Sequence, residues 1–385
     1  MPIGLEPNSK IKVLVTDAEY KHTLGIVRTL GQAGYYVVAL GYNKRAQSFY
    51  SKYCSEKLIS PNPKNEIEYI NFLKRYLLNN KIDVLLPVGY NSTMTISNHR
   101  DELLPFVAIP LAEKAAIDIA ADKSRTLELA RKINISAPNE YKSINSIIKY
   151  PVVVKGIFES GQIKYINSKE EGKKIDLSTN IIQEYVPGDG YGLYALFNKG
   201  ELRAFFMHKR VREYPVTGGS STCAKSVFCQ ELKDTGIKIL KELKWHGVAM
   251  VEFKKDFRYG NYVLMEINPK FWGSLDLSIF SNINFPRLLV EMTINGDIDP
   301  IEEYLTDIKF RWPFPDDVLH LFSNPSSIIQ MIREIFDKNA FSNVVIDDFH
   351  PNVVQIMNTI NSLIVRILNK KLWYPHGKPK LDNYR

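Results

Sequence analysis

The sequence predicts an α/β protein in three parts: a parallel, doubly wound sheet, then an α+β domain of mainly antiparallel strands, then a helical C-terminal segment. Three observations predict this arrangement. Residues 11–88 alternate short β-branched runs with helical patterns, residues 150–270 hold consecutive short strands joined by turns, and apolar residues after 300 recur at helical spacing. Strands that alternate with helices pair in parallel, whereas consecutive strands favour antiparallel pairing.

The first part predicts strands followed by polar loops. The first turn lacks the GxGxxG pattern, which disfavours a nicotinamide site. Ligands of a doubly wound sheet sit beyond the carboxyl ends of its strands, here residues 16–19 and 89–92. These loops could hold a substrate, but solvated turns look the same, and both interpretations stay open. Strands are expected at 11–15, 36–40 and 82–88, with helices at about 22–33 and 67–80.

Size and composition indicate a globular protein. The chain has 385 residues, of which 45% are hydrophobic and 24% charged, which is outside the range of disordered chains. At roughly 100–200 residues per domain, two or three domains are expected. No apolar run reaches the roughly 20 residues that span a bilayer, and the N-terminal residues lack the apolar core of a signal peptide. We therefore expect a cytoplasmic location and no integral membrane segment.

The cysteine pattern and the net charge further limit the possible classes of protein. The three cysteines form no CxxC pair, which favours reduced thiols over a structural zinc site. The net charge of +8 comes from Lys and Arg residues that are spread along the chain. A nucleic-acid surface would cluster its cations with aromatic side chains, so we expect no nucleic-acid partner. Most of this charge is interpreted as a solvated surface, with a few cations facing phosphates.

The most specific pattern is the strand pair in 247–270. Side chains two apart on a strand share a face, so Glu266 and Asn268 point the same way. If the strands form a hairpin with a loop near Tyr259, Glu252 lies opposite Glu266. Two carboxylates and an amide oxygen then converge, which suits Mg²⁺ held together with a nucleotide. A solvated acidic face is the alternative, and the apolar neighbours disfavour it because buried carboxylates need a cation.

A second pattern is a lysine at the end of an apolar strand. Lys155 ends this strand and precedes Gly156, Ser160 and Gly161. Backbone NH groups of a loop beside a lysine commonly hold phosphate oxygens. Taken alone this signal is weak, because a lysine at a strand end is usually solvated.

A third pattern is the glycine-rich turn after the strand within 181–197. Its exposed backbone edge could contact an adenine, and Asp189 could accept hydrogen bonds from ribose hydroxyls. As an isolated element it is a turn.

The fourth pattern is the basic strand and loop in 207–222. On a regular strand Arg210 and Arg212 share a face, away from Lys209, and could clamp phosphoryl oxygens. The loop 217–221 could bring backbone NH groups near a developing oxyanion. A charged edge strand is the alternative.

These four patterns occur in the order found in the ATP-grasp superfamily. From roughly residue 110 to 295 the chain resembles the branch of the carbamoyl-phosphate synthase large subunit and biotin carboxylase. VEF…MEINPKFWGS is the most specific match and QEYVPGDGYG supports it. The preceding region is similar to the Rossmann-like domain of these enzymes. The P-loop pattern GxxxxGK[ST] is absent, which argues against that other route to ATP.

The resemblance implies domains and residue roles. It implies a Rossmann-like domain at 1–110, an ATP-grasp domain at 111–300 with its ATP lid at about 125–190, and a helical extension of unknown role at 301–385. Lysine stands at 270, where the family usually has arginine, and a lysine cannot make the bidentate fork. For the nucleotide, Lys123 and Lys155 are implied to contact ATP phosphates, Glu184 and Val186 to meet the adenine through their backbone, and Asp189 to bind the ribose. For the reaction, Glu252, Glu266 and Asn268 are implied to bind Mg²⁺. Arg210, Arg212 and Lys270 are expected to act at the transferred phosphoryl group.

The implied activity is a two-step ligation. ATP phosphorylates a carboxylate, and an amine displaces phosphate from the acyl phosphate, with ATP and Mg²⁺ (or Mn²⁺) as cofactors. A carboxylase or carbamoyl-phosphate-type enzyme using bicarbonate is one alternative, and a non-catalytic nucleotide-binding protein is another. Small carboxylates and amines are the expected partners, and a homodimer is left open. Tail helices are expected near 328–336 and 353–368. The second is expected to pack against the body, with a membrane or partner surface as the alternative.

Overall fold

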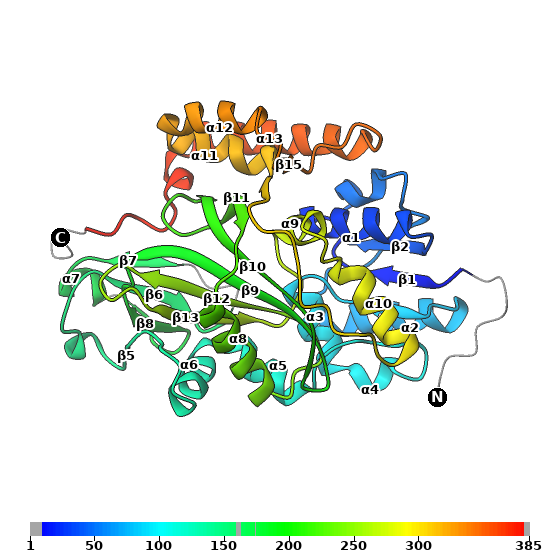
Figure 1. Ribbon diagram of the computed structural model, residues 1–385, viewed down its shortest axis with the longest axis horizontal. Helices are drawn as coiled ribbons and strands as arrows, with labels where there is room; N and C mark the ends of the chain where they lie inside the picture. The colour runs from blue at the N-terminus through cyan, green and yellow to red at the C-terminus, as the bar shows by residue number, and fades with distance from the viewer. Residues whose placement is uncertain (1–9, 159–162, 174, 381–385) are drawn as a thin grey trace.

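The computed structural model describes residues 10–158, 163–173 and 175–380, and it consists of three β-sheets with helices around them (Figure 1). The strands are β1 (Lys12–Val15), β2 (Tyr36–Gly41), β3 (Glu56–Ile59), β4 (Val84–Leu86), β5 (Glu140–Tyr141), β6 (Val152–Gly156), β7 (Lys164–Ile166), β8 (Asn180–Glu184), β9 (Gly188–Asn198), β10 (Glu201–Tyr214), β11 (Ser220–Ser226), β12 (Gly247–Asp256), β13 (Tyr262–Asn268), β14 (Lys309–Arg311) and β15 (Ala340–Ser342).

The helices pack around and between these sheets. They are α1 (Lys21–Gln32), α2 (Glu66–Asn79), α3 (Tyr90–Asn98), α4 (Arg100–Leu103), α5 (Lys114–Ala121), α6 (Lys123–Lys132), α7 (Lys169–Gly172), α8 (Gln230–Glu242), α9 (Leu275–Phe280), α10 (Phe285–Asn295), α11 (Val318–Ser323), α12 (Ile328–Ile335) and α13 (His350–Leu368). Single turns of 3-10 or π-helix occupy Gln47–Tyr50, Ile144–Ser146, Pro313–Asp317, Pro325–Ser327 and Lys370–Trp373.

The N-terminal sheet is parallel, with strand order β3-β2-β1-β4. The predicted strands near 11–15, 36–40 and 82–88 are present as β1, β2 and β4. The strand β3 was not predicted, because its residues alternate between exposed and half-buried and give no apolar run. The predicted α/β fold class is thereby confirmed for this part of the chain.

The polar loops after β1 and β4 bind each other. The Asp17 carboxylate accepts a hydrogen bond from the Gly89 backbone NH at 2.7 Å and another from the Ser92 hydroxyl. Asp17 and Ser92 are both buried. These groups therefore tie the ends of two neighbouring strands together, and neither Asp17 nor Ser92 is solvated.

The two remaining sheets form the central part of the molecule. A seven-stranded sheet has the order β13-β12-β9-β10-β11-β14-β15, and it is antiparallel except for the last pair. A smaller antiparallel sheet has the order β5-β8-β6-β7, and its own apolar core contains Val152, Val154, Ile166 and Ile182. The predicted antiparallel α+β region is confirmed. The domain boundaries 1–110, 111–300 and 301–385 stay predictions.

The C-terminal part contributes strands as well as helices. The strand β14 pairs with β11, and β15 pairs with β14 in parallel. Each is only three residues long, too short for its alternation to be recognised in the sequence. The extension is thus built into the edge of the central sheet.

Two large apolar cores hold the sheets together. One joins Leu14 and Leu85 of the N-terminal sheet to Leu193 and Phe205 of the central sheet, with α8 packed beside them. The other joins the opposite faces of both sheets through α1, α9 and α10. The central sheet is therefore fixed against the N-terminal sheet on both sides.

Buried ion pairs join the C-terminal helices to the body. Arg212 of β10 bonds Asp317 at 3.0 Å and Glu334 of α12 at 2.7 Å, and Arg28 of α1 bonds Asp348 at 2.8 Å. All three cysteines are free thiols. No helix of the described part is both long and apolar enough to cross a bilayer.

Candidate active site

The hairpin of β12 and β13 brings the three predicted metal ligands together. Its register places Glu252 directly opposite Glu266. The Asn268 amide nitrogen lies 3.1 Å from Glu266 Oε1 and 3.4 Å from Glu252 Oε1. Two carboxylates and one amide therefore converge, as the strand periodicity predicts.

A β-bulge in β13 aims the second carboxylate. Glu252 pairs with Glu266, but the next residue, Phe253, pairs with Leu264, so Met265 is an extra residue. Such a bulge shifts the alternation of side chains by one position. Leu264 consequently points into the apolar core while Met265 and Glu266 both line a cavity on the other face.

Cations surround the two carboxylates. Arg210 Nη2 lies 2.6 Å from Glu252 Oε2, and Lys123 Nζ lies 3.5 Å from Glu266 Oε2. Burial alone would raise the pKa of Glu266, but Lys123 and Lys155 outweigh it and lower the pKa to about 2. Burial raises the pKa of Glu252, although Arg210 opposes this shift. The pair therefore contains one firmly ionised carboxylate and one whose ionisation depends more on a nearby cation.

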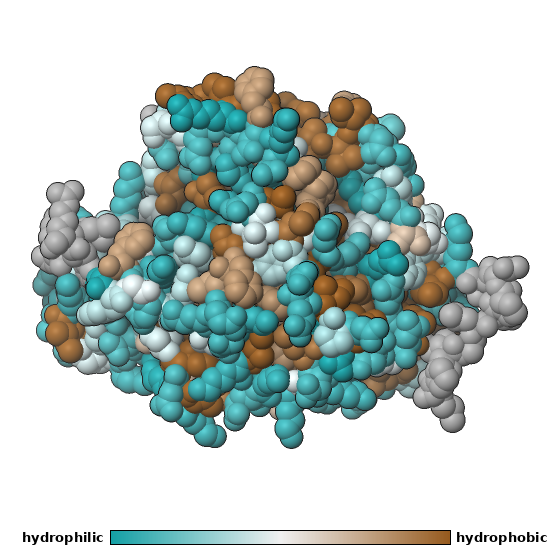
Figure 2. All heavy atoms as spheres, in the orientation of Figure 1, coloured by the Kyte–Doolittle hydropathy of each residue, from teal (hydrophilic) through white to brown (hydrophobic). Residues whose placement is uncertain are grey.

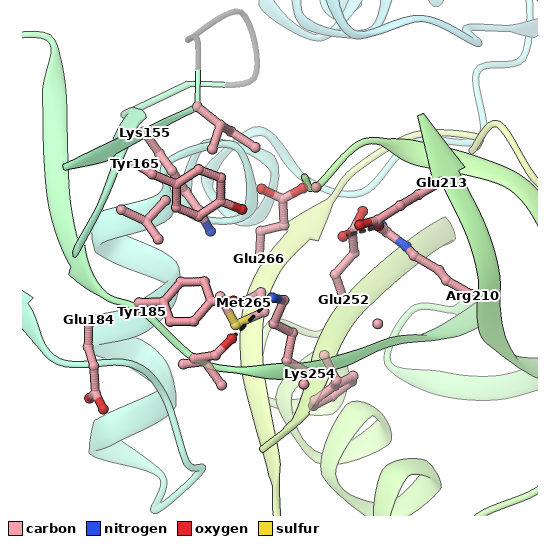
Figure 3. Close-up of a pocket in the computed structure, with 17 residues that line it drawn as sticks. Lys155, Tyr165, Glu184, Tyr185, Arg210, Glu213, Glu252, Lys254, Met265 and Glu266 are labelled. Carbon is pink, nitrogen blue, oxygen red and sulfur yellow. Dashed lines mark hydrogen bonds and ion pairs between the residues drawn. The ribbon is translucent and has the colours of Figure 1, made fainter. Parts of the chain in front are cut away.

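The buried Lys155 side chain faces these carboxylates from β6. Figure 3 shows its amine directed toward Glu266. Burial lowers the pKa of Lys155 to about 8, against the opposing effect of Glu266. Ser160 and Gly161, predicted to follow it in a phosphate-binding loop, lie outside the described residues.

A cavity of about 130 Å³ lies between the small sheet and the β12–β13 hairpin (Figure 3). Glu252, Glu266, Arg210 and Lys155 form its polar end. Five apolar residues, Val153, Ile163, Val186, Phe253 and Met265, also line it, and further polar residues lie at its edge. The cavity thus combines an apolar slot that suits a planar ring with a charged end that suits phosphates.

The turn between β8 and β9 forms one wall of this cavity. The Val186 carbonyl accepts a hydrogen bond from Lys254 Nζ at 3.1 Å. The Glu184 carboxylate turns away from the metal-ligand pair and binds Arg258 at 2.8 Å. Asp189 forms an ion pair with Lys209 at 2.6 Å.

A second cavity of about 360 Å³ adjoins the first, and both are lined by Arg210, Gly218, Glu252 and Glu266. Toward the N-terminal domain it is lined by Ser220, Asn268, Lys270, Trp272 and Ser274. The carboxylate pair therefore stands at the junction of two spaces, one beside the small sheet and one beside the N-terminal domain.

Comparison with known proteins finds the family that the sequence resembles. Residues 176–312 match a protein-family model described as "ATP-grasp in the biosynthetic pathway with Ter operon". The chain is 21% identical over 310 residues to D-aspartate ligase of Enterococcus faecium, covering 69% of this chain and 73% of the relative. It is 29% identical over 75 residues to D-alanine–D-alanine ligase of Fusobacterium nucleatum, covering 18% of this chain and 26% of that protein.

Solved structures share the fold. A biotin carboxylase from Campylobacter jejuni superposes with a TM-score of 0.63 at 13% identity, covering 77% of this chain and 74% of that one. The biotin carboxylase domain of Hydrogenobacter thermophilus 2-oxoglutarate carboxylase, solved with MgADP and bicarbonate, gives 0.60 at 16%, covering 77% and 73%. An L-amino acid ligase from Bacillus licheniformis gives 0.60 at 13%, covering 77% and 79%.

Residues 176–312 of the chain thus match an ATP-grasp family, and the chain shares the fold of biotin carboxylase and of an L-amino acid ligase. The resemblance predicted from the sequence is confirmed. The family model covers β8 to β14, including the hairpin that carries the three predicted oxygen ligands.

Arg212 does not join the ATP-grasp site. The register of β10 against β11 shifts between Arg210 and Arg212 and again before Glu213. Because of this bulge, Arg210 and Glu213 line the cavity, whereas Arg212 is buried against Asp317 and Glu334. The expectation that Arg210 and Arg212 share a face, and jointly clamp phosphoryl oxygens, assumed a regular strand and is wrong.

Several ATP-grasp cavity residues were not predicted. Lys254 lies two residues after Glu252 on β12, so period-2 alternation could have placed it on the same face. Glu213, Tyr165, Tyr185 and Met265 also line the cavity. Their positions follow from bulges and from the packing of two sheets, and a single sequence gives no signal for either.

A close approach of two strands explains one glycine of the site. A Cβ on Gly190 of β9 would lie 2.8 Å from Arg210 Cδ. The glycine therefore leaves the space through which Arg210 reaches Glu252.

The donor set fits a hard divalent cation. In the described part, no cluster of three or more His, Cys, Asp and Glu side chains could hold a metal ion. Two opposed carboxylates beside an amide give an incomplete oxygen shell, which Mg²⁺ completes with water and phosphate oxygens. The three ligand assignments stay predictions.

Proposed function

We propose that this protein is an ADP-forming ligase that activates a carboxylate as an acyl phosphate and joins it to an amine. One observation carries the proposal. Glu252, Glu266 and Asn268 converge where two cavities meet, and Lys123, Lys155 and Arg210 lie around them. This arrangement suits phosphoryl transfer from a nucleotide in one cavity to an acid in the other.

The nucleotide would occupy the cavity beside the small sheet. Its apolar slot suits an adenine, with the backbone of Glu184 and Val186 at the edge and Asp189 beside the ribose. Lys155 and Lys123 would then meet the phosphates as point charges. Opening of the Lys254 bond to the Val186 carbonyl would free that carbonyl for an adenine amino group.

Glu252, Glu266 and Asn268 would hold Mg²⁺, with Mn²⁺ as a substitute. The metal would offset the negative charge of the triphosphate during transfer. Arg210, held by the Gly219 carbonyl at 2.9 Å and by Glu252, would face the transferred phosphoryl group. Its charge is fixed, so it needs no proton exchange to act.

The acid and amine would meet in the second cavity. The carboxylate oxygen attacks the γ-phosphorus of ATP, and ADP leaves. The amine nitrogen then attacks the acyl carbon, phosphate leaves, and the amine loses a proton. Lys270 would neutralise the acyl phosphate, although its ammonium group cannot form the fork of an arginine.

Amino acids are the proposed substrate class. The relatives named above are ligases for aspartate, alanine or other amino acids, and an amino acid brings both a carboxylate and an amine. Peptides and cell-envelope precursors belong to the same chemical class. A cytoplasmic location, which supplies ATP and keeps thiols reduced, is part of the proposal, and a homodimer is left open.

Hydroxylamine provides the test, because it replaces the unknown amine with one small nucleophile. The protein would be incubated with ATP, MgCl₂, hydroxylamine and each D- or L-amino acid in turn. We expect an acyl hydroxamate, ADP and phosphate in equal amounts for one or a few acids. Hydroxamate formed with AMP and pyrophosphate would instead show adenylate chemistry and contradict the proposal.

Bicarbonate forms a separate arm of this assay. ADP release that needs bicarbonate and no amino acid would favour the carboxylase alternative. ATP binding with no turnover for any acid would favour the non-catalytic alternative.

A further inference from the structure

The C-terminal helices carry a broad exposed apolar surface, named here the C-terminal apolar face. Figure 2 shows hydrophobic side chains along the edge of the molecule formed by α11, α12 and α13 in Figure 1. Its exposed large apolar residues are Phe322, Ile328, Ile329, Ile332, Ile335, Phe336, Val344, Ile346, Phe349, Val353, Ile356, Met357, Ile360, Ile364, Val365, Ile367 and Leu368. Scattered apolar residues are normal on a surface, but a contiguous set of this kind marks a binding face.

The helix α13 is oriented with its polar side toward the protein. Asn352, Gln355 and Thr359 are buried. Asn352 Nδ2 bonds the Val345 carbonyl at 2.8 Å, and Gln355 Nε2 bonds Gln47 Oε1 at 2.8 Å. The helix does pack against the body as expected, but through the side opposite to the one its apolar residues suggest.

The outward side of α13 is apolar along its length. Ile356, Ile360 and Ile364 are 38%, 51% and 50% exposed, and Leu368 is 83% exposed. Residues four apart share a helix face, so these side chains form one stripe. A stripe of this kind is stable in contact with another apolar phase and costs free energy in water.

The helix α12 has the same inverted orientation. Its buried Glu334 bonds Arg212, while Ile329 and Ile335 are 61% and 63% exposed. Two neighbouring helices therefore direct their charged or polar side inward and their isoleucines outward. The buried ion pair fixes α12 in this orientation, since rotation of the helix would separate Glu334 from Arg212.

Charge around the C-terminal apolar face is positive. In the described chain after residue 321 all four carboxylates are ion-paired, as Glu334–Arg212, Asp337–Lys309, Asp347–Lys52 and Asp348–Arg28. The cations of this region without a carboxylate partner among the described residues are Arg333, Lys338, Arg366 and Lys371, together with Lys378 and Lys380, whose backbone is hydrogen-bonded to Asn167 after β7. Two copies of this face would bring these like charges together, whereas anionic headgroups would neutralise them.

We propose that the C-terminal apolar face docks on an anionic phospholipid surface. The isoleucines of α12 and α13 would enter the boundary between headgroups and acyl chains, and Arg333, Lys338 and Lys371 would contact lipid phosphates. The helices would lie along the surface. This docking does not depend on the ligase reaction, so either proposal can fail without the other.

Vesicle sedimentation with the full chain tests the docking. We expect binding to vesicles of phosphatidylcholine with phosphatidylglycerol, weaker binding at high salt, and much less binding to phosphatidylcholine alone. Absence of binding to the anionic vesicles overturns the proposal.

Matched variants assign the binding to this face. The triple variant Ile356→Asn, Ile360→Asn, Ile364→Asn is expected to weaken anionic-vesicle binding by about tenfold or more. The control Ile67→Asn, Ile148→Asn removes two isoleucines elsewhere that are even more exposed, at 73% and 91%, and is expected to bind as the unchanged protein does. Circular dichroism and the melting temperature verify that both variants fold.

Cation variants and sedimentation velocity complete the test. Lys338→Gln with Lys371→Gln is expected to reduce anionic-vesicle binding and its salt dependence. If the triple variant binds the anionic vesicles as strongly as the unchanged protein does, the assignment of binding to the C-terminal apolar face is overturned. A dimer that the triple variant abolishes, without vesicle binding, means that a second copy covers the face, and this also overturns the proposal.

Discussion

At the scale of single residues, the site depends on how buried charges adjust one another. Glu266 has a pKa near 2 because two lysines outweigh its burial, and Lys155 has a pKa near 8 because burial outweighs its carboxylate neighbour. Both groups carry charge at neutral pH, and each stabilises the charge of the other. A nucleotide and a divalent cation would enter a site in which charges are already arranged.

Replacing one oxygen ligand tests the metal assignment. Glu266→Gln removes a negative charge while keeping the size of the side chain, so ADP release should fall by roughly 100-fold or more. Circular dichroism should show a folded protein. Glu242→Gln, on the exposed face of α8, is the control and should leave turnover unchanged. Full activity of the Glu266 variant would contradict the assignment of this residue as a metal ligand.

The low pKa of Lys155 predicts a pH dependence of ATP binding. In the ligand-free protein Lys155 is an ammonium below about pH 8 and an amine above it. ATP binds the ammonium form, so affinity should be highest below pH 8 and fall toward tenfold per pH unit above it. Calorimetric titration across this range measures the effect. Lys155→Arg stays charged and should flatten the profile, and an unchanged profile would contradict the assignment.

At the scale of elements, two bulges decide which side chains enter the site. The sequence predicts the pairing of Glu252 with Glu266, because both strands are apolar and the loop is short. It does not predict that Met265 and Val211 interrupt the alternation, since a bulge depends on the partner strand. For the same reason Arg212 was placed on the wrong side. The strands β14 and β15 were missed because each is three residues long and pairs with a distant segment.

Because Arg210 and Arg212 have different surroundings, we expect replacement of Arg212 to lower stability and replacement of Arg210 to lower turnover. Arg212→Met leaves Asp317 and Glu334 buried without a cation, so the free energy of unfolding should fall by about 3–5 kcal/mol. Arg210→Met should mainly lower turnover, because its partner Glu252 keeps Lys155 nearby. Urea unfolding and ADP release separate the two effects. If the Arg212 variant lost turnover while its free energy of unfolding stayed unchanged, the result would support a role of Arg212 at the transferred phosphoryl group.

At the scale of the whole molecule, the site exists only where three parts meet. The small sheet supplies Lys155, the helix α6 supplies Lys123, and the central sheet supplies Arg210 and the carboxylates. Strand and helix periodicity predicted the kind of each part. It could not predict the orientation of α13, because helical spacing shows an apolar stripe without showing which way the stripe faces.

Assembly of the site from separate parts predicts that ligands stabilise the whole fold. A ligand at 100 times its dissociation constant adds about 2.7 kcal/mol when it binds only the folded state. ATP with MgCl₂ should therefore raise the melting temperature, and EDTA should remove most of the increase. Glu266→Gln should lose the part that depends on Mg²⁺. An equal shift with and without the metal would contradict joint binding of metal and nucleotide.

The transfer of oxygen from the acid to phosphate tests the central claim most directly. The acid that supports hydroxamate formation would be labelled with ¹⁸O in its carboxylate, and the released phosphate would be analysed by mass spectrometry. An acyl phosphate intermediate requires one labelled oxygen to appear in inorganic phosphate for each ADP formed. Label in AMP, or unlabelled phosphate, would contradict the account.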